Sequence, residues 1–238
     1  MIENIYDPSF VKDLFNRMST SYERMNYITS FGFSHRWRSQ FINRLPARME
    51  KTEVLDLLCG MGETWSFIKK RFPDSNLTAL DFSIEMIKKA EHKNTWYFDK
   101  KVDIIQADIL TDKIPGEKYD IVYCAFGLKT FSPEQLSILA KETFRLLKKG
   151  GQFSFVEVSK PENSILQMLY KLHIGTVVPF FGKLLLGNPE EYRMLWRYTE
   201  RFQNTKSVID IFQKTGLSIE FDSYFFGCAT GFHGRKIN

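Results

Sequence analysis

The stretch Val54-Leu55-Asp56-Leu57-Leu58-Cys59-Gly60-Met61-Gly62 is an apolar run that ends in a Gly-x-Gly sequence. Apart from Asp56, the residues before Cys59 are aliphatic, which is typical of a strand buried on both faces of a parallel sheet. Glycine is needed where the backbone takes a positive φ or approaches a ligand closely. The stretch therefore predicts a buried strand that feeds a tight turn beside a binding site.

Short apolar runs alternate with helical patterns from Lys51 to about Lys160. We predict strands at 52–58, 76–81, 102–108, 119–126 and 152–158, and helices near 64–71, 84–92 and 133–147. Two more strands, at 218–225 and 228–234, predict an antiparallel terminal hairpin. The sequence thus predicts an α/β fold with a Rossmann-like, mostly parallel seven-stranded sheet and helices on both faces.

Local signals mark the ends of the helix at 133–147. Ser132, Pro133 and Gln135 predict an N-cap, a first-turn proline and a capping box, and Gly150 predicts a left-handed C-cap.

Two segments lie outside the alternating core. Residues 1–50, with helical patterns at 8–18 and 35–44, predict an N-terminal helical cap, and residues 51–238 form the main domain. Residues 161–203 are an insertion between strands, rich in Phe, Leu, Met and Tyr, and they include a helix signal at Pro189. Ligand crevices of open α/β sheets lie beyond the carboxyl ends of the strands, so we expect the cap and this lid to roof the crevice.

Composition excludes several classes of protein. The 238 residues are 43% hydrophobic and 26% charged, which excludes a disordered chain. A net charge of +5, spread evenly along the chain and without a basic–aromatic stripe, gives no nucleic-acid signature, so we expect no nucleic-acid partner. Three cysteines and four scattered histidines predict neither a disulfide framework nor a metal site. We expect a cytoplasmic protein with at most peripheral membrane contact, because the apolar stretch at 174–186 is shorter than the ~20 residues of a span.

Three carboxylates end successive predicted strands: Asp56, Asp81 and Asp108. A carboxylate at Asp56 would repel a pyrophosphate and attract an ammonium group, and the third glycine of a dinucleotide fingerprint is absent after Gly62. Asp81 would accept from both hydroxyls of a ribose, and Asp108 from an adenine amino group, with Ile109 packing on the ring. An ammonium group, a ribose and an adenine without phosphate predict S-adenosylmethionine (SAM) as the cofactor.

Residues 54–62, 80–87 and 146–151 resemble class I SAM-dependent methyltransferases. Residues 22–26, 30–32 and 37–38, together with the tail at 227–234, resemble the UbiE-type ubiquinone and menaquinone C-methyltransferases. The resemblance spans nearly the whole chain. Together with the residue pattern it places the cofactor at Tyr22, Trp37, Asp56, Gly60, Met61, Gly62, Asp81, Phe82, Asp108, Ile109, Cys124 and Ala125.

The chain also departs from that family. Met61 replaces a threonine of the glycine turn, Ala125 replaces a serine, and Lys129-Thr130 replaces Arg-Asn. Glu23 stands for the family's aspartate, and Tyr198 for a small residue. These substitutions affect the predicted pocket for the methyl acceptor more than the residues predicted to bind the cofactor.

A ring carbon becomes nucleophilic when a neighbouring hydroxyl loses its proton, so the reaction needs a general base or a group that stabilises the phenolate. Lys129, Glu23 and His233 are the predicted catalytic residues, and His35 is a further candidate. Three functions stay open: C-methylation of a quinol-like or phenolic small molecule, O- or N-methylation of a specialised metabolite, and a silent SAM-binding pathway subunit. An aromatic or prenylated acceptor is the expected partner, without nucleic acid, and a homodimer is left open.

Overall fold

The computed structural model describes residues 4–19, 27, 30, 32–47, 50–172 and 189–237, without the side chains of 170, 171 and 189–192. Within these residues, seven strands form one sheet in the order β3-β2-β1-β4-β5-β7-β6. The strands are β1 (Glu53–Leu57), β2 (Asn76–Asp81), β3 (Val102–Gln106), β4 (Tyr119–Ala125), β5 (Leu147–Val158), β6 (Leu217–Tyr224) and β7 (Ala229–Lys236). Pairing is parallel from β3 through β5 and antiparallel at β5–β7 and β7–β6. The predicted fold is confirmed.

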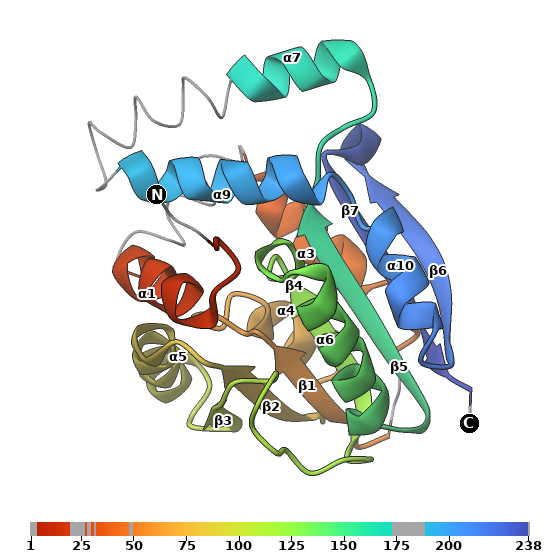
Figure 1. Cartoon of the computed structure of the whole chain (residues 1–238). Coiled ribbons are helices and arrows are strands. Elements are labelled where there is room, and N and C mark those ends of the chain that lie inside the picture. Colours follow the sequence, from red (N-terminus) through yellow and green to blue (C-terminus); the bar gives the residue numbers. More distant parts are fainter. Residues whose placement is uncertain are drawn as a thin grey trace.

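Helices cover both faces of the sheet (Figure 1). One face packs against α3 (Phe33–Ile42), α4 (Trp65–Arg71) and α5 (Ile84–Tyr97), and the other against α6 (Pro133–Leu146) and α10 (Lys206–Gln213). Successive side chains of a strand point to opposite faces. Val54 accordingly lies in the first core and Leu55 in the second, which explains why the central strands are apolar without alternation.

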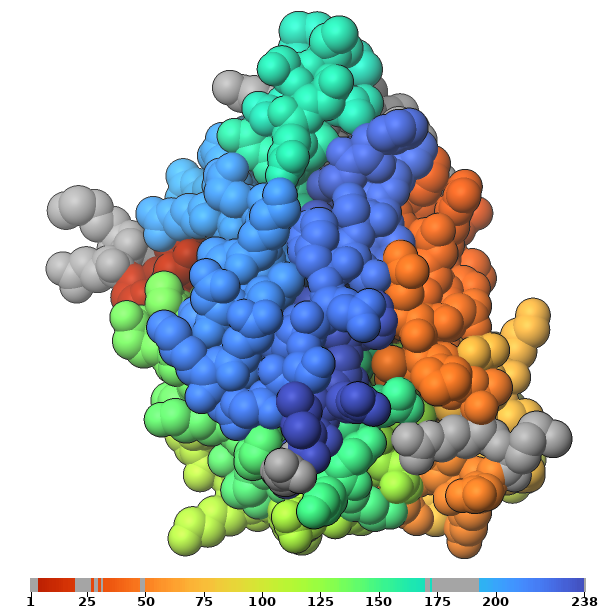
Figure 2. Space-filling view, turned by 90° about the vertical axis from the view of Figure 1, so that its right-hand side faces the viewer, coloured from red at the N-terminus to blue at the C-terminus, as the bar shows by residue number. Residues whose placement is uncertain are grey.

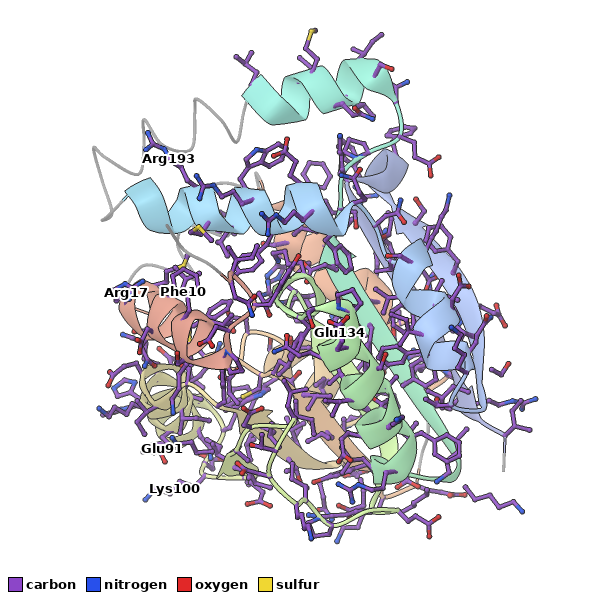
Figure 3. The ribbon with its side chains drawn as sticks, viewed as in Figure 1. Phe10, Arg17, Glu91, Lys100, Glu134 and Arg193 are labelled. Atoms are coloured by element: carbon purple, nitrogen blue, oxygen red, sulfur yellow. The ribbon has the colours of Figure 1, made fainter. Side chains whose placement is uncertain are left out.

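Three helices lie at the end of the molecule where the parallel strands finish (Figure 1). Buried residues of α1 (Pro8–Met18) and α9 (Pro189–Phe202), such as Leu14 and Tyr198, form a third core with Met61 of the glycine turn. Phe10 of α1 packs on this core, and Figure 3 shows it below α9. The third helix, α7 (Ser164–Leu172), projects as the apex of the molecule (Figure 2). The predicted lid thus contributes α9 to the core around the turn.

The local signals at α6 are confirmed at one end and wrong at the other. Ser132 accepts from the Gln135 N–H, and the Gln135 side chain accepts from the Ser132 N–H, which completes the capping box. Gly150 does have a positive φ of 72°, but the helix ends at Leu146 and β5 begins at Leu147. Gly150 lies in a bulge where β5 changes register against β4. The residues that we assigned to a helix cap therefore belong to strand β5.

Two short 3-10 helices complete the described elements, η1 (Leu128–Thr130) after β4 and η3 (Phe225–Gly227) between β6 and β7. The N-terminal helices pack closely on the rest of the chain, because Trp37 and Phe41 of α3 belong to the first core of the sheet. The division into a cap at 1–50 and a domain at 51–238 stays a prediction.

Candidate active site

A cavity of about 860 Å³, partly open to solvent, lies at the carboxyl ends of β1, β2 and β4. Much of the wall is aromatic, with Tyr6, Phe15, Phe82, Phe126 and Phe131. The charged residues that the structure places on this wall are Arg38, Glu63, Asp81 and Asp108. The cavity therefore offers a few charges in an apolar, planar setting.

The glycine turn forms the floor of this cavity at the end of β1. Gly60 has a φ of 55° and Gly62 a φ of 78°, a region that side-chain-bearing residues rarely adopt. A Cβ on Gly62 would also lie 2.6 Å from the ring of Trp65. Gly60 lines the cavity, whereas Gly62 gives the turn its shape. Both glycines of the predicted motif are thus required by backbone geometry.

Asp81, the last residue of β2, is fixed by two backbone hydrogen bonds. Its Oδ2 accepts from the Gly60 N–H and its Oδ1 from the Ser83 N–H, both at 2.9 Å. Burial raises the pKa of Asp81 to about 6, although these N–H donors act in the opposite direction. The side chain lines the cavity as predicted for a ribose-binding carboxylate, and the glycine turn holds it in place.

Asp56 lies inside β1 and is not among the described residues of the cavity wall. The residue is 1% exposed, and its Oδ2 has no hydrogen-bond partner within the described part of the chain. Burial, followed by repulsion from Glu63, raises the pKa of Asp56 to about 8, while Arg38 acts in the opposite direction. An unpartnered carboxylate oxygen in a buried position is costly, and a cationic ligand at the turn would offset that cost.

The remaining predicted cofactor residues divide into those on the wall and those behind it. Phe82, Asp108, Ile109 and Ala125 line the cavity, and Asp108 Oδ1 accepts from the Leu110 N–H at 2.9 Å.

Cys124, Met61 and Trp37 are not among the described residues of the wall. Cys124 is fully buried in the second core, Met61 belongs to the third, and the Trp37 ring packs on Phe33 and Phe126. Tyr22 lies outside the described residues.

Arg38 and Glu63 are site residues that we did not predict. Arg38 comes from α3, and Glu63 follows the glycine turn, where its Oε2 accepts from the Met61 N–H at 3.1 Å. Their side chains are both 9% exposed, and the Arg38 Nη2 lies 3.7 Å from the Glu63 Oε1. Two signals in the sequence could have indicated these residues. Glu63 directly follows the Gly-x-Gly turn, and Arg38 is next to Trp37, a predicted cofactor residue. Nothing in the sequence indicated that the two side chains meet.

Lys129 of η1 is 5% exposed and forms a buried ion pair. Its Nζ lies 2.5 Å from Glu157 Oε1 and also donates to the Phe126 carbonyl at 3.3 Å. The other Glu157 oxygen accepts from the Lys129 N–H. Phe126 has a φ of 65°, so this ion pair supports a backbone conformation that is unfavourable by itself. The Lys129 side chain is engaged behind the cavity wall, which does not include it.

His233 lies in β7, directly across from Ser154 in the middle of β5. Its Nδ1 is 2.8 Å from Asp222 Oδ2, and Asp222 also pairs with Arg44 at 2.7 Å. The structure does not place His233 on the described cavity wall. His35 packs edge-on against the Phe67 ring, and Glu23 lies outside the described residues.

Comparison with known proteins gives the family. The sequence profile of the ubiE/COQ5 methyltransferase family matches residues 3–236. The chain belongs to this family. The demethylmenaquinone methyltransferase of Lactococcus lactis is 30% identical over 230 residues, which are 95% of this chain and 89% of that protein.

Solved structures of low identity share the fold. Phosphoethanolamine N-methyltransferase 2 of Haemonchus contortus, in complex with S-adenosyl-L-methionine, matches with a TM-score of 0.61 at 13% identity. The match covers 85% of this chain and 53% of that one, so this chain spans about half its length. A SAM-dependent methyltransferase of Aquifex aeolicus matches with a TM-score of 0.54 at 17% identity, over 79% of this chain and 85% of that one.

The protein is therefore a SAM-dependent methyltransferase, and the predicted activity and cofactor are confirmed. The residues fit this cofactor, because Gly60 of the turn and Asp81 both line the cavity, and the unpartnered Oδ2 of Asp56 suits a cationic ligand. Among the described residues, no helix is long and apolar enough to span a membrane.

Proposed function

We propose that this methyltransferase acts on a ring carbon of a quinol-like or phenolic small molecule. The observation that carries the proposal is the demethylmenaquinone methyltransferase of L. lactis, at 30% identity over nearly the whole of both chains. The aromatic wall of the cavity supports it, because Phe15, Phe126 and Phe131 offer planar apolar surfaces to a ring.

Asp81, Asp108 and Asp56 have separate roles in cofactor binding in this proposal. Asp81 accepts from the ribose hydroxyls, since its oxygens are already oriented by Gly60 and Ser83. Asp108 and Ile109 hold the adenine, and Asp56 compensates the positive charge above the glycine turn. Bound SAM would supply a methyl group bonded to a positively charged sulfur, which is a good leaving group. The protein's own contribution is to place the acceptor in line with that methyl group.

We further propose distinct roles for the three predicted catalytic residues. Glu23 is the general base, a role that Glu23→Gln would abolish while leaving SAM binding unchanged. Lys129 is a positioning residue, because its ammonium group is held by Glu157 and the Phe126 carbonyl. His233 stabilises the terminal hairpin through Asp222. A low kcat with an unchanged cofactor affinity in Glu23→Gln supports the role of Glu23 as general base, and full activity of that variant contradicts it.

The acceptor is tested by incubating the enzyme and SAM with demethylated quinols, simple phenols and amines, followed by mass spectrometry that locates the new methyl group. Methylation at a ring carbon is expected, and Asp81→Asn serves as the inactive control. A methyl group found only on oxygen or nitrogen would favour the second function. Binding of SAM without any methylation would favour a silent pathway subunit.

We also propose peripheral membrane contact through α7. Ile165, Met168, Leu169 and Leu172 are 52–66% exposed and recur at helical spacing, as in helices that lie on a membrane surface. Co-sedimentation with phosphatidylglycerol vesicles is expected for the parent protein and lost in Met168→Ser/Leu169→Ser. The matched control is Trp96→Ser/Tyr97→Ser, since these aromatics are also well exposed but lie at the end of α5. Equal losses in both double variants contradict the proposal.

A further inference from the structure

Arg38 is the single cation among the described residues that line the cavity, and three acids share the wall with it. All three acids accept from backbone N–H groups: Asp81 from Gly60 and Ser83, Asp108 from Leu110, and Glu63 from Met61. The third acid, Glu63, is the one that approaches Arg38. The cavity wall therefore carries a charge pair of opposite signs, Arg38 and Glu63, in addition to two further acids.

The Arg38 guanidinium is held in place by its neighbours, but not all of its N–H donors have a hydrogen-bond acceptor among the described residues. Its Cζ lies 4.8 Å from the centroid of the Phe126 ring, which is a cation–π arrangement. Its Nη2 is 3.7 Å from Glu63 Oε1, which is too long for a good hydrogen bond. The Nε finds no acceptor within the described part of the chain. A guanidinium with 9% side-chain exposure and an unused donor is set up to receive a planar anion.

Glu63 is the complementary half of this arrangement. Its Oε2 is fixed by the Met61 N–H, and its Oε1 has no hydrogen-bond partner among the described residues. An ideal Cβ built on Gly60 would lie 3.0 Å from Glu63 Oε2, while the Gly60 N–H donates to Asp81. Gly60 thus adjoins both acids, so Asp81 and the Glu63–Arg38 pair flank the same residue of the glycine turn.

We infer that Arg38 and Glu63 form a clamp for the amino-acid end of SAM, in which Arg38 binds the α-carboxylate and Glu63 the α-ammonium group. This zwitterion supplies an acceptor for the unused Arg38 donor and a donor for Glu63 Oε1. Leaving such buried atoms unpaired is unfavourable, so their pairing contributes to affinity. The inference rests on SAM being the cofactor and does not depend on the identity of the acceptor.

The Phe126 ring favours arginine over lysine at position 38. A guanidinium stacks on an aromatic ring and binds a carboxylate through two parallel N–H groups, whereas a lysine ammonium is a point charge on a flexible chain. Arg38→Lys should therefore recover only part of the affinity that Arg38→Met loses. Glu63 also acts as a positioning residue for the turn, because it holds the Met61 N–H.

The test is calorimetric and does not measure methylation. S-adenosylhomocysteine carries the amino-acid end, and 5′-deoxy-5′-methylthioadenosine lacks it. Arg38→Met should weaken binding of S-adenosylhomocysteine about 10- to 100-fold, the range of a hydrogen bond between charged groups, and leave the truncated ligand within about twofold. Arg44→Met is the matched control. Arg44 also lies over an aromatic ring, that of Tyr224, and pairs with a carboxylate, that of Asp222, but is not on the described wall.

Equal weakening of both ligands by Arg38→Met, or of neither, overturns the inference. A second experiment uses the parent protein alone and compares SAM with decarboxylated SAM, which lacks the α-carboxylate. The parent protein should bind SAM at least tenfold more tightly. Equal affinity for these two ligands also overturns it. Failure of the parent protein to bind S-adenosylhomocysteine at all would instead contradict the cofactor assignment, so the two failures are distinguishable.

Discussion

The buried carboxylate of Asp56 makes the stability of this enzyme depend on pH near neutrality. Burial raises the pKa of Asp56 from 3.8 to about 8, so between these values the folded protein holds a proton that the unfolded chain has released. The free energy of unfolding therefore falls as pH rises through this window. Integrated from pH 6 to pH 8, the loss from Asp56 is about 2 kcal/mol, at ~1.4 kcal/mol per pH unit.

Substitution of Asp56 by asparagine removes this titration and keeps the side-chain volume. We expect the difference in stability between Asp56→Asn and the parent to shift by about 2 kcal/mol in favour of the variant from pH 6 to pH 8. For a chain of this length that corresponds to about 4–8 °C in Tm. Asp81, with a pKa of about 6, adds less than ~0.5 kcal/mol over the same window.

Thermal and urea unfolding at both pH values, without SAM, measure the effect. The control is Asp99→Asn, because the Asp99 side chain is 81% exposed and should change stability equally at both pH values. Parallel pH dependences of the parent and Asp56→Asn would refute the reasoning, since they would mean that Asp56 does not titrate in this range.

Three further substitutions test the local geometry. Gly62→Ala should lower the free energy of unfolding by about 2–4 kcal/mol, because it forces a side chain to a φ of 78° against the Trp65 ring; an unchanged urea midpoint would contradict this. Lys129→Met should cost about 3–5 kcal/mol by leaving the Glu157 carboxylate without its buried partner. Adding Glu157→Gln should then recover at least half of that loss in the same assay, and no recovery would count against the ion-pair argument. Ser132→Ala should cost about 1 kcal/mol in thermal unfolding through loss of the capping box, and an unaltered Tm would argue against it.

Much of the fold could be predicted because its signals are local. The capping box joins Ser132 to Gln135, three residues along the chain, so short-range propensity decides it. The prediction of a helix cap at Gly150 failed for the opposite reason. The chain on either side of Gly150, at Leu147 and Gln152, pairs with β4, a strand that lies some thirty residues earlier, and long-range pairing overrides a local preference.

The candidate site shows the same division. Asp81 and Asp108 could be placed at the cavity because the carboxyl ends of parallel strands meet at one edge of the sheet. The alternation of short apolar runs with helical patterns likewise determined the parallel sheet. The two glycines determined the turn after β1, because their positive φ is a property of the local backbone.

Only the tertiary structure decided which charged side chains meet. It brings Arg38 of α3 beside Glu63 of the glycine turn, and it pairs Lys129 with Glu157 behind the cavity wall instead of placing Lys129 on it. Each of these contacts joins side chains from separate elements. Their distances depend on how helices and strands pack against one another, and this packing is a property of the whole core that no local stretch of sequence encodes.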